Sequence, residues 1–178
     1  QQSSLHPSEP LYFCESMENF TVEETGRLIG KVLGSAVDAD AALIPLGEYH
    51  GPGVGLRNGI TGKLYKGKIN NETVASILPA YDGKYAVMNL TGAQVKELAD
   101  TGFDADGDGN PYPYLLVTRG DMKLEDERIY RVAFLSDGYT EETGNAYSVQ
   151  VLEGSLKSFL QKWMAEQKEI SPAGNPWE

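Results

Sequence analysis

The chain has 178 residues, a formal net charge of -11 at pH 7 and a pI near 4.6. Its length suits a single domain with its own core, and 40% hydrophobic with 23% charged residues is ordinary for a soluble globular protein. The acidity excludes a nucleic acid polymer as the expected partner, and the absence of a long apolar run argues against membrane insertion. A small nucleotide stays compatible, because it needs only a few local cations.

The chain divides into an extended lead-in over residues 1–20 and a domain over residues 21–178. Thr21 and Glu24 form a capping box, which predicts a helix beginning at Val22 and ending near Val37. Apolar residues follow it at helical spacing, namely Leu28, Ile29, Val32, Leu33 and Ala36. The sequence DAALIPL at 40–46 predicts a short buried strand.

A glycine-dense segment then runs from Gly47 to Gly67 and is too long for a plain connector. We expect it to be a functional or disordered loop. Asn70 or Asn71 can cap a short helix over 73–77, which ends before Pro79.

The stretch 78–98 combines a turn, a strand over 84–90 and a helix that begins at the capping box of Thr91 and Gln94. An acidic turn (FDADGDGN) precedes a strand at 114–118, and RIYRVAFL at 128–135 is the strongest buried strand. A loop over 136–147 and a helix over 152–166 complete the pattern. Helices and strands alternate without strict βαβ spacing, so we expect the α+β class with a mixed sheet and packed helices.

The 78–98 unit resembles the LPF-x-N, strand, TG-x-Q-x-x-E signature of the C-terminal domain of the family of 5'-nucleotidases, UDP-sugar hydrolases and 2',3'-cyclic-nucleotide phosphodiesterases. Further segments are similar to this family in the same order: TGRLI at 25–29, ADAALI at 39–44, GVGLR at 53–57, GKI at 67–69 and YRVA at 130–133. The resemblance spans roughly residues 25–163. It implies the family's C-terminal fold and a nucleoside or nucleotide ligand.

The same resemblance implies a ligand site. Arg57 takes the place of a ligand-binding arginine beside Gly55, and Tyr81 that of a base-stacking aromatic. Gly83 stands where the family has Asn, so one side-chain hydrogen bond to the base is lost. The family's GGD loop is absent after 133, where Tyr139 or Tyr147 is the candidate for the second stacking ring. The alternatives are a packed turn aromatic for Tyr81 and a solvated charge for Arg57.

A catalytic centre is not expected in this segment. Two-metal phosphoester hydrolysis needs clustered His and carboxylate ligands, whereas the chain has only His6 and His50 and no D-x-H or G-N-H-[DE] match. Its one cysteine, Cys14, is interpreted as inert. In the family, hydrolysis belongs to an N-terminal metallophosphoesterase domain with a di-metal centre. We therefore expect this chain to be part of a longer secreted, periplasmic or cell-surface protein that carries such a domain in cis.

The acidic turn offers a candidate calcium site. Its alternating oxygen side chains match the first seven positions of a calcium loop, namely Asp104, Asp106, Asp108 and Asn110. The twelfth position is Leu115, so the last ligand would come from Asp100 or Asp121. The alternative is a solvated Asp/Gly turn.

Two hypotheses follow from the sequence. The first is the nucleoside-recognition domain of a 5'-nucleotidase-like phosphohydrolase acting in nucleotide catabolism. The second is a diverged binding or structural module of the same fold, without catalysis and stabilised by calcium.

Overall fold

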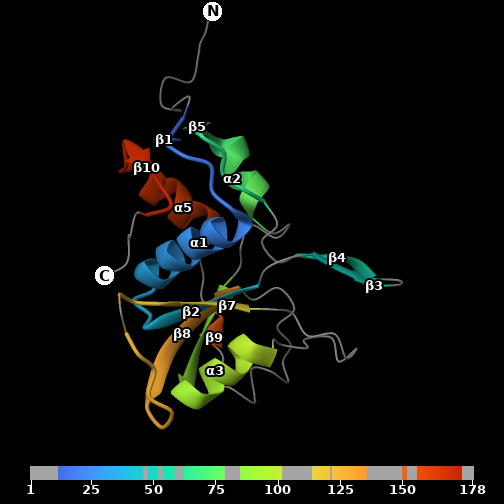
Figure 1. Ribbon diagram of the computed structural model, residues 1–178, viewed down its shortest axis with the longest axis vertical. Helices are drawn as coiled ribbons and strands as arrows, with labels where there is room; N and C mark the ends of the chain where they lie inside the picture. The colour runs from blue at the N-terminus through green and yellow to red at the C-terminus, as the bar shows by residue number, and fades with distance from the viewer. Residues whose placement is uncertain are drawn as a thin grey trace, which may run out of the picture.

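The computed structural model describes residues 12–45, 48–51, 54–58, 62–78, 85–101, 114–120, 122–135, 150–151 and 156–173. These residues form an elongated arrangement in which α1 crosses the middle (Figure 1). A small sheet with α2 and α5 lies on one side of α1. The main sheet lies on the other, followed by α3.

Helix α1 spans Val22–Ala36, one residue shorter than predicted. The predicted capping box is present: Glu24 N–H donates to Thr21 Oγ1 at 3.0 Å, and Thr21 N–H donates to Glu24 Oε1 at 2.9 Å. Gly30 lets the helix approach the main sheet, because a Cβ there would lie 2.9 Å from Val117 Cγ2. The apolar face is buried through Leu28, Ile29, Val32 and Leu33.

The main sheet has the strand order β7-β2-β8-β6-β9 among the described residues. Strand β2 pairs in parallel with β8, and the other neighbours are antiparallel. The sheet is therefore mixed, and the predicted α+β class is confirmed. The strand bounds are Tyr114–Thr118 for β7, Ala41–Pro45 for β2, Ile129–Leu135 for β8, Tyr85–Thr91 for β6 and Gln150–Val151 for β9.

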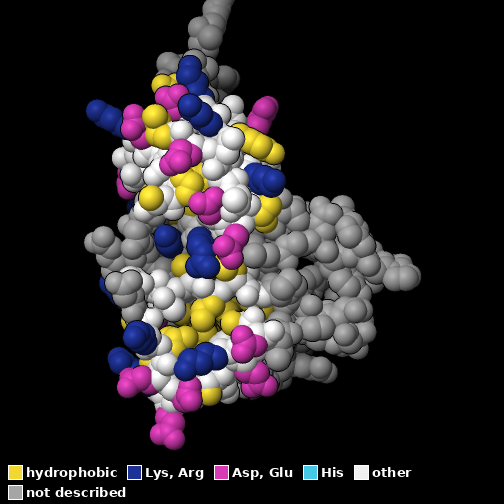
Figure 2. Space-filling view, viewed as in Figure 1, with side chains coloured by type: hydrophobic (Ala, Val, Ile, Leu, Met, Phe, Trp, Pro, Cys, Tyr) yellow, Lys and Arg dark blue, Asp and Glu magenta, His cyan; other side chains and the backbone are white. Residues whose placement is uncertain are grey.

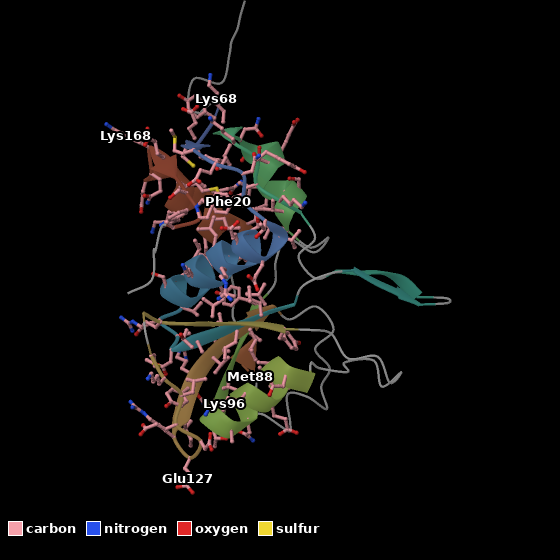
Figure 3. The ribbon with its side chains drawn as sticks, viewed as in Figure 1. Phe20, Lys68, Met88, Lys96, Glu127 and Lys168 are labelled. Atoms are coloured by element: carbon pink, nitrogen blue, oxygen red, sulfur yellow. The ribbon has the colours of Figure 1, made fainter. Side chains whose placement is uncertain are left out.

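The main sheet is covered on both faces. Successive side chains along each strand point to opposite faces, and each face belongs to its own core cluster. The face toward α1 buries Ala42, Ile44, Val117 and Ala133. The opposite face packs against α3, which spans Gly92–Thr101, and buries Leu43, Met88, Leu90, Tyr130 and Val132. Figure 3 shows Met88 between the sheet and α3.

A second, smaller sheet has the order β10-β1-β5, with bounds Glu169–Ile170, Cys14–Ser16 and Gly67–Ile69. Strand β1 pairs in parallel with β10 and antiparallel with β5. Helices α2 (Asn71–Ile77) and α5 (Leu156–Ala165) pack beside this sheet. The lead-in predicted for the first 20 residues thus contributes a paired strand, which its sequence did not indicate.

The glycine-dense segment differs from its prediction as a loop. It contains strand β3 (Glu48–Gly51) and strand β4 (Val54–Asn58), which form an antiparallel hairpin that projects to one side in Figure 1. Backbone hydrogen bonds build a hairpin whatever the side chains, so frequent glycines conceal the pattern that identifies strands. Among the described helices, none combines the length and apolarity required to cross a membrane.

Candidate functional site

Four strands of the main sheet have their first or last residue at the same end of the sheet, along the strand direction. We call this end the loop end. Strand β2 ends at Pro45, opposite the first residue of β7, Tyr114. Strand β8 runs parallel to β2 and ends at Leu135, opposite the first residue of β6, Tyr85. Four segments of the chain are therefore attached to the sheet at the loop end. Two of them follow Pro45 and Leu135, and the other two precede Tyr85 and Tyr114.

The residues that the sequence assigns to a ligand site belong to these four segments. Gly55 and Arg57 lie in β4, 10 and 12 residues after Pro45, and the backbone of Arg57 pairs with that of Tyr49 in β3. Tyr81 and Gly83 precede Tyr85. The side chain of Arg57 and all of Tyr81 and Gly83 lie outside the described residues, so their mutual distances stay predictions.

The remaining predicted residues follow the same pattern. Tyr139 and Tyr147 come after Leu135, and the acidic turn lies between α3 and Tyr114. These positions, with Asp104, Asp106, Asp108 and Asn110, are also outside the described residues. The topology thus attaches the segments of these residues at the loop end, although their sequence separation does not reveal this. The candidate last calcium ligand Asp121 is different, because it follows β7 at the opposite end of the sheet.

The residues that hold the loop end are tightly packed. Tyr85 is buried, and its ring lies 5.3 Å from that of Phe159 in α5, in a tilted arrangement. Burial raises the pKa of the Tyr85 phenol. Ile77 is buried, and Leu78 packs against the same core cluster. The segment that contains Tyr81 therefore leaves and re-enters the fold at fixed points.

The opposite end of the main sheet, which we call the far end, is closed by hydrogen bonds. Arg131 N–H donates to Asp40 Oδ2 at 3.0 Å, and Arg131 Nε donates to the Val37 carbonyl at 3.2 Å. The Arg119 guanidinium lies 3.3 Å from Asp38 Oδ1. These contacts join α1, β2 and β8, and we assign them a structural role.

One open depression lies at the far end, in the turn before β8. It has a volume of about 530 Å³ and is lined by Glu125, Asp126, Glu127 and Arg128. All four residues are exposed. Figure 3 shows Glu127 at the extremity of the molecule. Solvated carboxylates on an open turn do not supply the enclosure that a small-molecule site needs.

Catalytic groups are scarce in the part of the chain that the structure describes. No three His, Cys, Asp or Glu residues there gather as a metal site. Cys14 is buried, and burial raises the pKa of its thiol to about 11, so the thiolate needed for nucleophilic attack does not form near neutral pH. The interpretation of Cys14 as inert agrees with this geometry. The side chains of His6 and His50 are outside the described residues.

No family model and no curated protein matches this sequence. Solved structures do match it: a 5'-nucleotidase precursor of Thermus thermophilus (16% identity, TM-score 0.60), a NAD nucleotidase of Haemophilus influenzae (9%, 0.61) and a sulfate thiohydrolase of Thermus thermophilus (11%, 0.60). The matches cover 89%, 93% and 92% of this chain, but 37%, 37% and 34% of those chains.

Identities this low establish a shared fold and no more. The agreement is independent of the motifs, because it compares the course of the backbone over nearly the whole chain. The chain therefore shares its fold with about a third of the length of each of these proteins, two of which are named as nucleotidases. This agrees with the fold that the resemblance of its sequence to the C-terminal domain of the 5'-nucleotidase family implied.

Proposed function

We propose that this chain is the nucleoside-recognition domain of a 5'-nucleotidase-like phosphohydrolase and that it binds its ligand at the loop end of the main sheet. The observation that carries the proposal is topological. The segments of Arg57, Tyr81 and Tyr139 are separated widely in sequence, yet all attach to the sheet at that end. The fold shared with two nucleotidases supports it.

The proposed chemistry uses aromatic stacking for the base and hydrogen bonds for the sugar. Tyr81 stacks on one face of the base, and Tyr139 or Tyr147 supplies the other face, since aromatic rings bury large areas with few rotatable bonds. The Arg57 guanidinium donates to ribose or phosphate oxygens. Gly55 and Gly83 permit close approach of the backbone to the ligand.

Hydrolysis is assigned to an N-terminal metallophosphoesterase domain in cis. This chain spans only 34–37% of the matching solved structures, which leaves room in such proteins for a second domain. A di-metal centre in that domain would activate water and stabilise the phosphoryl oxygens. A location outside the cytoplasm is part of the same proposal and follows from the resemblance.

The second candidate is a non-catalytic binding or structural module of the same fold. It is favoured by the sulfate thiohydrolase, whose name indicates that this fold also occurs in a protein that is not a nucleotidase. The replacement of the expected Asn by Gly83 points the same way. In this reading, Asp104, Asp106, Asp108 and Asn110 bind calcium and stabilise the acidic turn.

Ligand titration of the 178-residue protein separates these candidates. Adenosine, uridine and AMP are titrated by calorimetry, with thermal unfolding as a second readout. The first proposal expects millimolar or tighter binding of a nucleoside, and about a fivefold or greater loss on Tyr81→Ala or Arg57→Ala, because stacking and charge-assisted hydrogen bonds each contribute about 1–3 kcal/mol.

Matched controls are available on the described surface. Arg128 is an exposed arginine at the far end, 3.7 Å from Glu125, and Tyr12 is 42% exposed beside the small sheet. Arg128→Ala and Tyr12→Ala remove the same chemical groups away from the loop end, so affinity should stay unchanged. The absence of any nucleoside binding at millimolar concentration contradicts the first proposal and supports the second.

A further inference from the structure

Gly62 lies where the glycine-dense segment returns to the body of the fold. A Cβ built on Gly62 would lie 2.6 Å from the carbonyl oxygen of Ser76 and 2.9 Å from the Cα of Ile77. Both neighbours are backbone atoms in the last turn of α2, so neither can rotate away. The chain thus passes directly against the end of α2, at a distance that only glycine permits.

The residues after Gly62 are held on a second side by α1, and we call 62–66 the anchor segment. Leu64 is fully buried, its N–H donates to Thr25 Oγ1 at 3.3 Å, and its carbonyl accepts from Phe20 N–H at 2.8 Å. Lys66 N–H donates to Asn19 Oδ1 at 2.8 Å. The hydroxyl of Thr25, one of the buried polar side chains, also donates to the Thr21 carbonyl. The anchor segment is therefore wedged between the N-terminus of α1 and the C-terminus of α2.

The contact between the anchor segment and the end of α2 lies between the two segments that carry the proposed ligand-binding residues. Arg57 precedes Gly62 by five residues, and Tyr81 follows Ile77 by four residues. At about 3.6 Å per extended residue, Arg57 is at most about 18 Å from Gly62 and Tyr81 at most about 14 Å from Ile77. The backbone contact between Gly62 and the end of α2 is thus one of the fixed points that set the relative position of the two residues.

We propose that Gly62 is a positioning residue that fixes the spacing of Arg57 and Tyr81 around one ligand. This inference rests on the proposed function, because it assigns a role toward the same ligand. Gly62 itself does not touch the ligand. A side chain at this position pushes the anchor segment away from α2 and displaces the strand of Arg57 relative to the segment of Tyr81.

The test is the variant Gly62→Ala, with Gly92→Ala as its matched control. Gly92 is the first residue of α3, and a Cβ there would overlap the carbonyl oxygen of Glu125 at the far end. Each variant thus adds one methyl group against a backbone carbonyl, but only Gly62 adjoins the proposed ligand-binding segments. Affinity for adenosine is measured per mole of folded protein, with the folded fraction taken from circular dichroism.

Gly62→Ala should weaken binding on the order of tenfold to a hundredfold, whereas Gly92→Ala should lower the melting temperature and leave the affinity unchanged. Should Gly62→Ala not fold, Thr25→Val tests the same wedge, since it removes the acceptor for Leu64 N–H without adding bulk. It should weaken binding about threefold or more.

Equal affinities of the wild type, a folded Gly62 variant and Gly92→Ala overturn the positioning role but keep the nucleoside site. Equal losses in both glycine variants also overturn it, while failure of the wild type to bind any nucleoside refutes the proposed function and the inference with it.

Discussion

At the scale of single residues, burial suppresses the reactivity of the one cysteine side chain. Cys14 has 1% of its surface exposed, and burial raises the pKa of its thiol from 9.0 to about 11. The sequence supports an inert cysteine because no activating base is adjacent. The structure adds the physical cause, which is the cost of placing a thiolate among apolar neighbours.

This raised pKa predicts a loss of stability in alkali. Below pH 9 the thiol is protonated in both the folded and unfolded states. Between pH 9 and 11 the unfolded thiol ionises while the folded one keeps its proton, so the free energy of unfolding falls as pH rises, by about 2–3 kcal/mol from this group. Urea unfolding of the wild type should show this fall in excess of the fall in Cys14→Ala. Parallel pH profiles for the two proteins would contradict the prediction.

At the scale of elements, helices with local capping signals were predicted well. The box of Thr91 and Gln94 forms as expected, with Gln94 N–H donating to Thr91 Oγ1 at 3.2 Å and Thr91 N–H donating to Gln94 Oε1 at 2.9 Å. At α2 the structure selects Asn70 over Asn71 as the cap. Capping depends on neighbours within three residues, so sequence suffices. The pairing of β1 with both β5 and β10 joins residues far apart, and no local pattern encodes it.

At the scale of elements, we predict a response to calcium for the acidic turn between α3 and β7. If its carboxylates bind calcium, millimolar Ca²⁺ relieves their mutual repulsion and raises the melting temperature, by an amount equivalent to about 1–2 kcal/mol for a site with a Kd of about 10⁻⁴ M. Thermal unfolding with Ca²⁺, with Mg²⁺ and with EGTA measures this.

The control for the calcium prediction is an aspartate of another turn. Asp106→Asn should abolish the calcium effect. Asp126→Asn should preserve it, because Asp126 pairs with Lys96 at 2.8 Å at the far end. A melting temperature that does not respond to calcium would leave the turn as a solvated one.

At the scale of the whole molecule, the net charge is distributed unevenly. Charges of both signs are interspersed on the described surface in Figure 2. The segments attached at the loop end contain eight acidic residues, namely Glu48, Asp82, Asp104, Asp106, Asp108, Asp137, Glu141 and Glu142, against the basic Arg57 and Lys84.

This distribution predicts different salt dependences for two ligands. Adenosine is uncharged, so its affinity should change less than about twofold between roughly 0.05 and 0.5 M NaCl. AMP brings a phosphate to an acidic end of the molecule, so its affinity should rise with salt as the repulsion is screened. Calorimetric titration of the isolated chain measures both. An AMP affinity that falls with salt would show that attraction to cations such as Arg57 dominates.

The sequence by itself determined the helices, most strands of the main sheet and the chemical types of the proposed ligand-binding residues. Periodicity and capping are local, and apolar alternation fixes which face of a strand is buried. Only the tertiary structure decided that the segments of Arg57, Tyr81 and Tyr139 share one end of a sheet. It also revealed the close approach of Gly62 to α2, because this approach depends on packing between distant parts of the chain.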